Sequence, residues 1–240
     1  MKKFIHNIYY FFYLSFNWNL FLAFFVIWHE LKRGPKYRIN TVKPENLRRL
    51  TIREGDISKS SPYEAVSYYL LETVLESFRK FSNASSIVDL GCGKGRVMVA
   101  AAYFGFVSIT GIDFAKELCE EAEKNMKKIE DKFYNLNWKV ICKDVLNYKI
   151  EANNEVFFIN NPFEKEILNK FLEKLEMSLK NYPRTVWFLY AIPVHLDLLL
   201  QYNYNIIDEI HPIKRLHAVI LKKPASSPNH LYYETTGLVI

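Results

Sequence analysis

The sequence has little cysteine and glycine, and over most of its length it has no excess of basic residues. Its 3 cysteines, Cys92, Cys119 and Cys142, are too few and too widely spaced for a disulfide framework or a cysteine-rich zinc site. We therefore expect reduced thiols and a cytoplasmic protein. Residues 61–240 carry 21 basic and 22 acidic side chains, a net charge of −1. This balance disfavours nucleic acid as a partner, because phosphate binding draws on clustered Lys and Arg.

The basic excess lies in the first quarter of the chain, where residues 1–60 hold 11 basic and 4 acidic side chains. Half of the 240 residues are apolar and 24% are charged, which excludes a disordered or collagen-like chain. This length and composition predict one full-sized domain with a buried core, together with an N-terminal extension.

Residues 1–38 form the predicted extension, a hydrophobic helix with a basic flank. Residues 4–28 contain no formal charge and 12 aromatic side chains, enough to cross a bilayer as one helix. The polar residues of this segment do not share one helix face, which disfavours an amphipathic helix at the membrane surface. No small-residue cleavage pattern follows the segment, which disfavours a signal peptide. We expect a membrane anchor with the downstream domain in the cytoplasm, because Lys32, Arg33, Lys36 and Arg38 follow the run. The alternative is a helix packed on the domain or on a second copy.

Residues 39–61 are polar, contain Pro44 and Gly55, and are predicted to be a connector with little core of its own. Ser60 or Ser61 before Pro62 is typical of a helix start. Apolar side chains at spacings of three and four then predict an amphipathic helix over residues 62–81 that leads into the main domain, residues 62–240.

From residue 85 short apolar runs alternate with helical stretches, which predicts an α/β fold. Strand followed by helix followed by strand implies a mostly parallel, doubly wound sheet with helices on both faces. Ligands of such sheets bind at the carboxyl ends of the strands. The expected strands are residues 85–90, 107–113, 138–144, 156–161, 184–192, 205–210 and 217–223, and the expected helices are residues 95–105, 115–129 and 164–180.

The first strand leads into a glycine-rich turn with an acid in front of it. Glycines at 91, 93 and 95 let backbone N–H groups approach a ligand closely, although an ordinary strand-to-helix loop has the same pattern. The spacing is G-x-G-x-G, and Asp89 stands where a dinucleotide-binding loop has an apolar residue. A carboxylate there would repel a pyrophosphate and accept hydrogen bonds from an ammonium group, which favours a ligand with an amino-acid end.

Two further acids follow the next strands. Asp113 lies 22 positions after Gly91, where an acid binds both hydroxyls of a ribose, although Asp is also a common helix N-cap. Asp144 can accept an exocyclic adenine amine while Val145 covers the ring, or it can be a solvated turn residue. Ammonium, ribose and adenine together describe S-adenosylmethionine.

Residues 87–161 resemble the class I S-adenosylmethionine-dependent methyltransferases, with VDLGCGKGR as the glycine-rich loop, GIDF as the ribose acid and CKDV as the adenine acid. The resemblance implies a Rossmann-like, seven-stranded sheet whose last strand is antiparallel. It also implies a cofactor site that includes Tyr63, Cys92, Phe114 and Asn160.

The turn Asn160-Asn161-Pro162-Phe163 is similar to the Asn/Asp-Pro-Pro-aromatic signature of methyltransferases acting on planar amines, with Asn161 in place of the first Pro. A side-chain oxygen and a backbone carbonyl there accept two N–H bonds and aim the nitrogen lone pair, while Phe163 stacks on the acceptor. The same residues also suit a plain turn. We expect N-methylation of an amine or amide on a protein or small molecule, with Asn160, Pro162 and Phe163 as catalytic residues.

A second resemblance is to the membrane-attached protein lysine methyltransferases of the ATP-synthase c-subunit type, carried by the hydrophobic N-terminus, Tyr63 and DLGxGxGR. In that case Tyr190 would orient the amine. Two other classes are a nucleotide-dependent oxidoreductase, disfavoured by Asp89, and a non-catalytic cofactor-binding module. His195, His211 and His217 have no metal-ligand spacing, and we expect no metal site.

Overall fold

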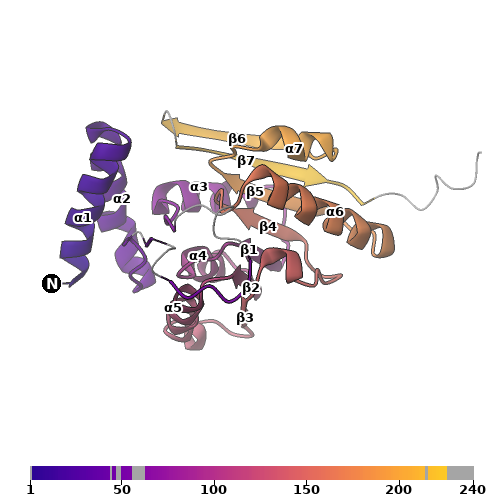
Figure 1. Ribbon diagram of the computed structural model, residues 1–240, viewed down its shortest axis with the longest axis horizontal. Helices are drawn as coiled ribbons and strands as arrows, with labels where there is room; N and C mark the ends of the chain where they lie inside the picture. Colours follow the sequence, from indigo (N-terminus) through magenta and orange to yellow (C-terminus); the bar gives the residue numbers. More distant parts are fainter. Residues whose placement is uncertain (1, 44, 47–49, 56–62, 214–215, 226–240) are drawn as a thin grey trace, which may run out of the picture.

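A computed structural model describes residues 2–43, 45–46, 50–55, 63–213 and 216–225 of the chain. Seven strands form one sheet in the order β3-β2-β1-β4-β5-β7-β6 (Figure 1). The first five strands along the chain run parallel, and β7 is antiparallel to β5 on one side and β6 on the other. The predicted Rossmann-like sheet with an antiparallel last strand is confirmed. The strands are β1 (Ser86–Leu90), β2 (Ser108–Asp113), β3 (Asn137–Cys142), β4 (Val156–Ile159), β5 (Val186–Ala191), β6 (Asn205–Ile213) and β7 (Leu216–Lys223).

Helices cover both faces of the sheet because the central strands are apolar on both sides. On one face α3 (Tyr68–Phe78), α4 (Arg96–Tyr103) and α5 (Lys116–Lys127) enclose a core that includes Ile87, Ile109 and Phe158. On the other, α6 (Lys165–Asn181) and α7 (Leu196–Gln201) pack on side chains such as Val88 and Phe157. Such two-sided burial is typical of parallel sheets and explains the continuous apolar runs of β4 and β5.

The helix predicted over residues 62–81 begins later than expected. Residues 60–62, the predicted start, lie outside the described part, and the helix begins at Tyr68, where the Ser67 hydroxyl accepts from the Leu70 N–H. Residues 63–67 are not helical, so this part of the expected helix is absent from the structure. The short helix α7 and the 3-10 turns η3 (Glu130–Lys132) and η4 (Val145–Asn147) were not predicted.

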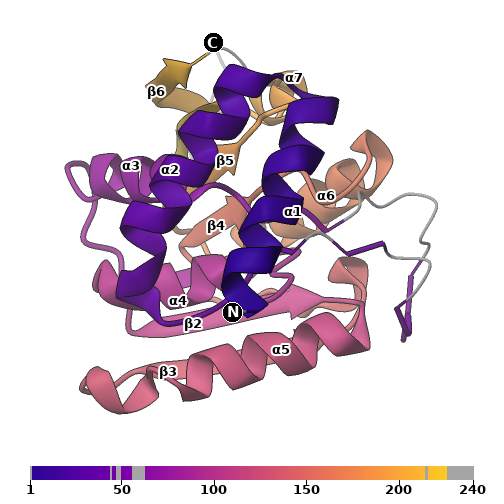
Figure 2. The ribbon, with the colours of Figure 1, turned by 90° about the vertical axis from the view of Figure 1, so that its left-hand side faces the viewer.

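The N-terminal helix is present, but it is divided into two. Helix α1 (Lys2–Asn17) ends before Trp18, and α2 (Leu20–Tyr37) begins after Asn19, whose side chain accepts from the Leu22 N–H and caps the new helix. The two helices pack against each other as a hairpin (Figure 2). No helix in the described part of the chain has the length and apolar character needed to cross a bilayer. The expectation of one spanning helix over residues 4–28 is therefore not supported.

The hairpin packs on the domain through its inner side. Glu30 of α2 forms an ion pair with Arg96 of α4 at 2.6 Å, and both side chains are almost fully buried. Arg96 also donates to the Thr41 hydroxyl and the Val66 carbonyl, and its guanidinium lies over the Tyr68 ring. Because Arg96 directly follows the glycine-rich turn, the ion pair joins the hairpin to that turn.

Part of the predicted connector lies against the domain. Ile39, Thr41 and Val42 are buried, and the Thr41 carbonyl accepts a hydrogen bond from the Tyr63 hydroxyl at 2.8 Å. Further on, Ile52 pairs with Ala115 at the start of α5. This segment therefore borders the carboxyl edge of the sheet, where ligands of such folds bind.

Candidate functional site

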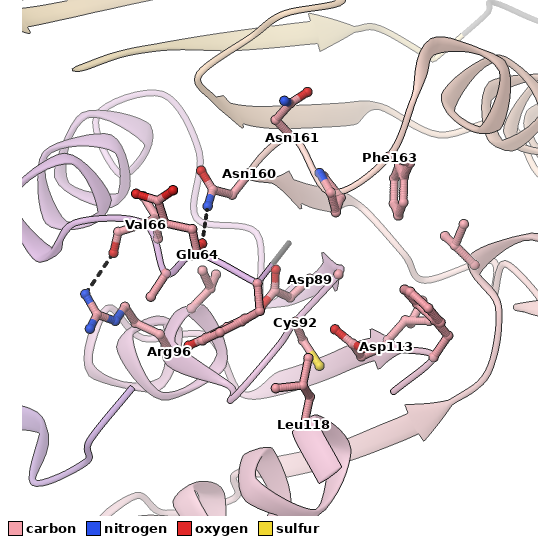
Figure 3. A pocket seen from close by; sticks show the side chains of 18 of the residues that line it. Glu64, Val66, Asp89, Cys92, Arg96, Asp113, Leu118, Asn160, Asn161 and Phe163 are labelled. Carbon is pink, nitrogen blue, oxygen red and sulfur yellow. Dashed lines mark hydrogen bonds between the residues drawn. The ribbon is translucent and has the colours of Figure 1, made fainter. Parts of the chain in front are cut away.

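A pocket of about 770 Å³, counted up to its open mouth, lies at the carboxyl ends of β1, β2 and β4 (Figure 3). Ten of the residues expected to form the site line it, namely Tyr63, Asp89, Gly91, Cys92, Asp113, Phe114, Val145, Asn160, Pro162 and Phe163. The parallel sheet has thus brought together residues that are up to 100 positions apart.

Asp89 lies at the base of the pocket with only 3% of its surface exposed. Among the described residues, its Oδ2 atom has no hydrogen-bond partner. Burial, and secondarily the nearby Asp113, raise the pKa of Asp89 well above its usual value. A buried acceptor without a donor is unfavourable by itself, so the site is suited to a ligand that brings N–H donors and a positive charge.

Two glycines of the turn are in close contact with other parts of the site. A Cβ atom on Gly93 would lie 2.2 Å from the Tyr63 ring, and one on Gly91 would lie 2.5 Å from Pro162 Cβ. Both residues also have a positive φ, which L-residues with side chains rarely adopt. The two glycines therefore allow Tyr63 and Pro162 to close around the turn.

Asp113 joins the glycine-rich turn to the start of α5. Its two carboxylate oxygens accept from the Gly93 N–H at 2.9 Å and the Ala115 N–H at 3.0 Å. Burial raises the pKa of Asp113 to about 6, although these backbone hydrogen bonds act in the opposite direction. The N-cap of α5 is Ala115, so Asp113 is not the N-cap that the sequence left open. It does line the pocket, where it can accept ribose hydroxyls.

The third acid does not line the pocket. The Asp144 carboxylate accepts from the Leu146 N–H at 2.7 Å and lies against Gly55, so it serves as the cap of the turn η4. Its neighbour Val145 does line the pocket, together with the apolar side chains Ile112, Phe114 and Leu118. The pocket can therefore cover an adenine ring, while the prediction that Asp144 binds the adenine amine gains no support.

Two other expected residues lie beside the pocket and support it. Gly93 binds Asp113 through its N–H, and Gly95 is the left-handed residue before α4, where a Cβ would lie 3.1 Å from Ala122. Cys92 does line the pocket, but burial raises the pKa of its thiol well above its usual value, so it is a neutral packing group.

The turn after β4 faces the glycine-rich loop. Asn160 donates from its amide nitrogen to the Glu64 carbonyl at 3.1 Å, which orients the side chain (Figure 3). Its Oδ1 atom and that of Asn161 are buried and have no partner within the described part of the chain. Asn161 also has a positive φ of 48°. The turn thus holds two acceptor atoms in place beside the pocket.

Sequence reasoning missed the segment of residues 63–67 except for Tyr63. Glu64, Ala65 and Val66 line the pocket from its open side, and no motif marks them. Arg96 and Lys143 also line it, and although both stand in quoted motifs, VDLGCGKGR and CKDV, neither was expected to be a site residue. Tyr190 was considered as an amine-orienting residue, but it is buried in the sheet and its hydroxyl accepts from the His195 N–H. It does not line the pocket.

These features fit S-adenosylmethionine. The unpartnered Asp89 oxygen suits the ammonium of its amino-acid end, Asp113 suits the ribose, and the apolar wall around Phe114 suits the base. Asn160 and Asn161 line the same pocket as Asp89 and Asp113. In the described part of the chain, no group of three His, Cys, Asp or Glu side chains is arranged to hold a metal ion.

Comparisons with known proteins agree with this assignment. The family model described as a methyltransferase domain matches residues 87–181. A magnesium protoporphyrin IX methyltransferase from Synechocystis, solved with bound S-adenosylmethionine, shares the fold with a TM-score of 0.50 and 14% identity over 66% of this chain and 79% of its own. A putative RNA methyltransferase from Pyrococcus horikoshii gives a TM-score of 0.51 and 14% identity over 75% of this chain and 95% of its own.

A curated relative, an uncharacterized protein of Methanocaldococcus jannaschii, is 27% identical over 148 residues. The match covers 61% of this chain and 60% of the relative's length. The family match, the sheet order and the residues of the pocket lead to one assignment. Residues 87–181 match the methyltransferase domain family, and the sheet that they belong to has the fold of S-adenosylmethionine-dependent methyltransferases.

Proposed function

We propose that this enzyme transfers the methyl group to a nitrogen atom held by the turn Asn160-Asn161-Pro162-Phe163. The observation that supports this most is the orientation of Asn160, whose amide nitrogen is bound to the Glu64 carbonyl so that its oxygen is left as an acceptor. A buried acceptor at the mouth of the cofactor pocket is suited to an N–H donor. An oxygen or carbon acceptor would bring fewer donors to these atoms.

The residues of the chain act mainly by positioning. S-adenosylmethionine supplies an electrophilic methyl group on a sulfonium, and transfer is an in-line displacement that depends on alignment. Asp89 and Asp113 hold the donor, Asn160 accepts from the acceptor nitrogen, and Phe163 lies on the same wall as a platform for an apolar or planar group. Tyr63 and the connector around Thr41 limit access of water from the open side.

The experiment combines a variant with a product assay. Purified protein is incubated with radiolabelled S-adenosylmethionine and a fractionated lysate, and label is followed into membrane protein, soluble protein, RNA and small molecules. Asn160→Ala should abolish most methyl transfer, because alignment contributes a large part of the rate. Binding of S-adenosylhomocysteine should be largely retained. Unchanged product formation by Asn160→Ala would refute the role of the turn and favour a non-catalytic cofactor-binding module.

A second candidate is a membrane-associated protein lysine methyltransferase. The outer side of the hairpin carries one apolar stripe on each helix, with Phe12 and Phe16 on α1 and Phe21, Phe24 and Trp28 on α2 all more than half exposed. In Figure 2 the hairpin α1–α2 lies in front of the sheet, toward the viewer. The excess of basic residues in the first quarter of the chain would favour an anionic lipid surface.

Sedimentation with vesicles tests the membrane contact. The full chain should sediment with vesicles that contain phosphatidylserine and remain in solution with purely zwitterionic vesicles or without lipid. Label entering membrane protein in the lysate assay would then favour the second candidate. Protein that stays in solution with both kinds of vesicle would refute the membrane contact and leave the first proposal unaffected.

A further inference from the structure

A second cavity of about 860 Å³ lies between the N-terminal hairpin and the domain. It meets the cofactor pocket at a shared wall formed by residues 64–66 together with Asn160 and Asn161. A molecule in this cavity can therefore reach the two asparagine side chains from the side opposite the donor. The donor pocket and the second cavity therefore share these residues as common lining.

The far side of the second cavity is apolar and aromatic. It is lined by side chains of α1 and α2, namely Tyr10, Tyr13, Leu14, Trp18, Leu22 and Val26. On the domain side Leu70, Ile192 and Leu216 complete the wall. Such a surface favours an apolar stem and disfavours a phosphate-bearing or strongly hydrated acceptor.

The wall shared by the two cavities presents three side-chain acceptors. The Glu64 carboxylate accepts a hydrogen bond from the Tyr13 hydroxyl at 3.4 Å. The Oδ1 atoms of Asn160 and Asn161 are buried without a partner among the residues described. Leaving buried acceptors unpaired is unfavourable, so the ligand that fits must bring several N–H donors to one point.

The charge of Glu64 separates an amine from an amide. Burial raises the pKa of its carboxyl from the usual value, while the hydrogen bonds from Tyr13 and Tyr10 act in the opposite direction. Glu64 is partly buried, and a cation stabilises a carboxylate in such a place. A neutral amide would satisfy the asparagines and leave the carboxylate charge unpaired. An ammonium group provides both the donors and the charge, and the nearby tyrosine rings also favour a cation.

We propose that the cavity between the hairpin and the domain is the methyl-acceptor site, and that it takes an amine carried on an apolar stem, bound by Glu64, Asn160 and Asn161. The inference rests on the proposed N-methyl transfer and narrows its acceptor. The ammonium gives one proton to the Glu64 carboxylate, and the freed lone pair forms the new N–C bond as the S–C bond breaks and its electron pair stays on sulfur. The product is then a methylated ammonium ion, and Glu64 returns its proton to water.

Calorimetry with three probes of one stem length tests the acceptor class without requiring turnover. Hexylamine, hexanamide and hexan-1-ol are titrated into the full chain saturated with S-adenosylhomocysteine. Hexylamine should bind at least about tenfold more tightly than the amide and the alcohol, because hydrogen bonds to charged groups are the stronger ones. Equal binding of the three probes, or no binding of hexylamine, would overturn the proposal.

Glu64→Gln tests the residue itself. In protein saturated with S-adenosylhomocysteine it should weaken hexylamine binding by about tenfold or more. The matched control is Glu76→Gln, because Glu76 is an exposed glutamate on α3. Unchanged amine binding in Glu64→Gln would also overturn the proposal. If S-adenosylhomocysteine binds and hexylamine does not, the acceptor proposal fails and the methyltransferase assignment stands. If S-adenosylhomocysteine itself does not bind, the result counts against the donor site.

Discussion

The ion pair between Glu30 and Arg96 should be the interaction on which the position of the N-terminal hairpin depends. Its two side chains are only 3% and 4% exposed, and a second contact of 3.0 Å makes the pair bidentate. In Glu30→Gln the guanidinium keeps its hydrogen bonds to Thr41 and Val66 but loses its counter-charge. Removing one partner of a buried pair costs about 3–5 kcal/mol, and because these two hydrogen bonds are kept, we expect about 3 kcal/mol for this variant.

Denaturant unfolding of the wild type and Glu30→Gln measures this difference. The control is Glu120→Gln, which removes an exposed pair with Lys116 at 3.8 Å on α5 and should change the stability by less than about 0.5 kcal/mol. Replacing both Glu30 and Arg96 by Met should recover most of the lost stability, because a buried pair exchanged for apolar side chains is often neutral.

Hydrogen exchange locates the effect. Because the pair joins α2 to the start of α4, Glu30→Gln should lower protection in α1, α2 and the glycine-rich turn more than in β5. A loss of less than about 1 kcal/mol in Glu30→Gln would contradict the reasoning. So would a double variant that is as unstable as the single one, since the unpaired charge would then not be the cause.

Two further predictions concern the donor pocket. Gly93→Ala should reduce binding of S-adenosylhomocysteine by at least about tenfold in calorimetry. The new Cβ would lie 2.2 Å from the Tyr63 ring, and the backbone there has a φ of +52°. Binding equal to wild type would contradict this prediction and show that the Tyr63 ring can move away freely. Asp113 has a folded-state pKa raised from 3.8 to about 6, so its contribution to stability is present below about pH 4 and is lost as the pH rises through about 6. From pH 4 to pH 7 the stability of Asp113→Asn relative to wild type should therefore increase by roughly 2.5 kcal/mol in denaturant titrations. A difference that does not vary with pH would contradict this origin.

The sequence predicted the sheet and the donor side of the site because both depend on local patterns. Strands of four to nine residues alternating with helices restrict the topology strongly, and the carboxyl ends of parallel strands lie on one edge. Asp89 and Asp113 end or nearly end β1 and β2, so their positions in the chain already place them in one pocket. Asp144 follows the same pattern, but its carboxylate binds a local N–H, and local hydrogen bonding of this kind cannot be read from spacing.

The N-terminal segment shows where a sequence pattern was insufficient. Hydropathy over residues 4–28 is consistent with one continuous helix, yet Asn19 caps a second helix and the chain folds back. The buried partner of Glu30 is Arg96, 66 residues away, and no local rule predicts that pairing. The position of α1 and α2 follows from this long-range contact and from the packing of their inner sides on the domain.

The amino-acid sequence by itself determined the class of fold, the donor and the turn that faces it, because strand periodicity, glycine spacing and acids at strand ends act over short distances. Only the tertiary structure decided what lies opposite the donor. Glu64 precedes α3 without any motif. It becomes part of the second cavity only because the hairpin packs over it and places Tyr13 and Trp18 on the far wall. An acceptor site built from segments that are distant in the chain depends on how those segments pack, and that information is held in no single stretch of sequence.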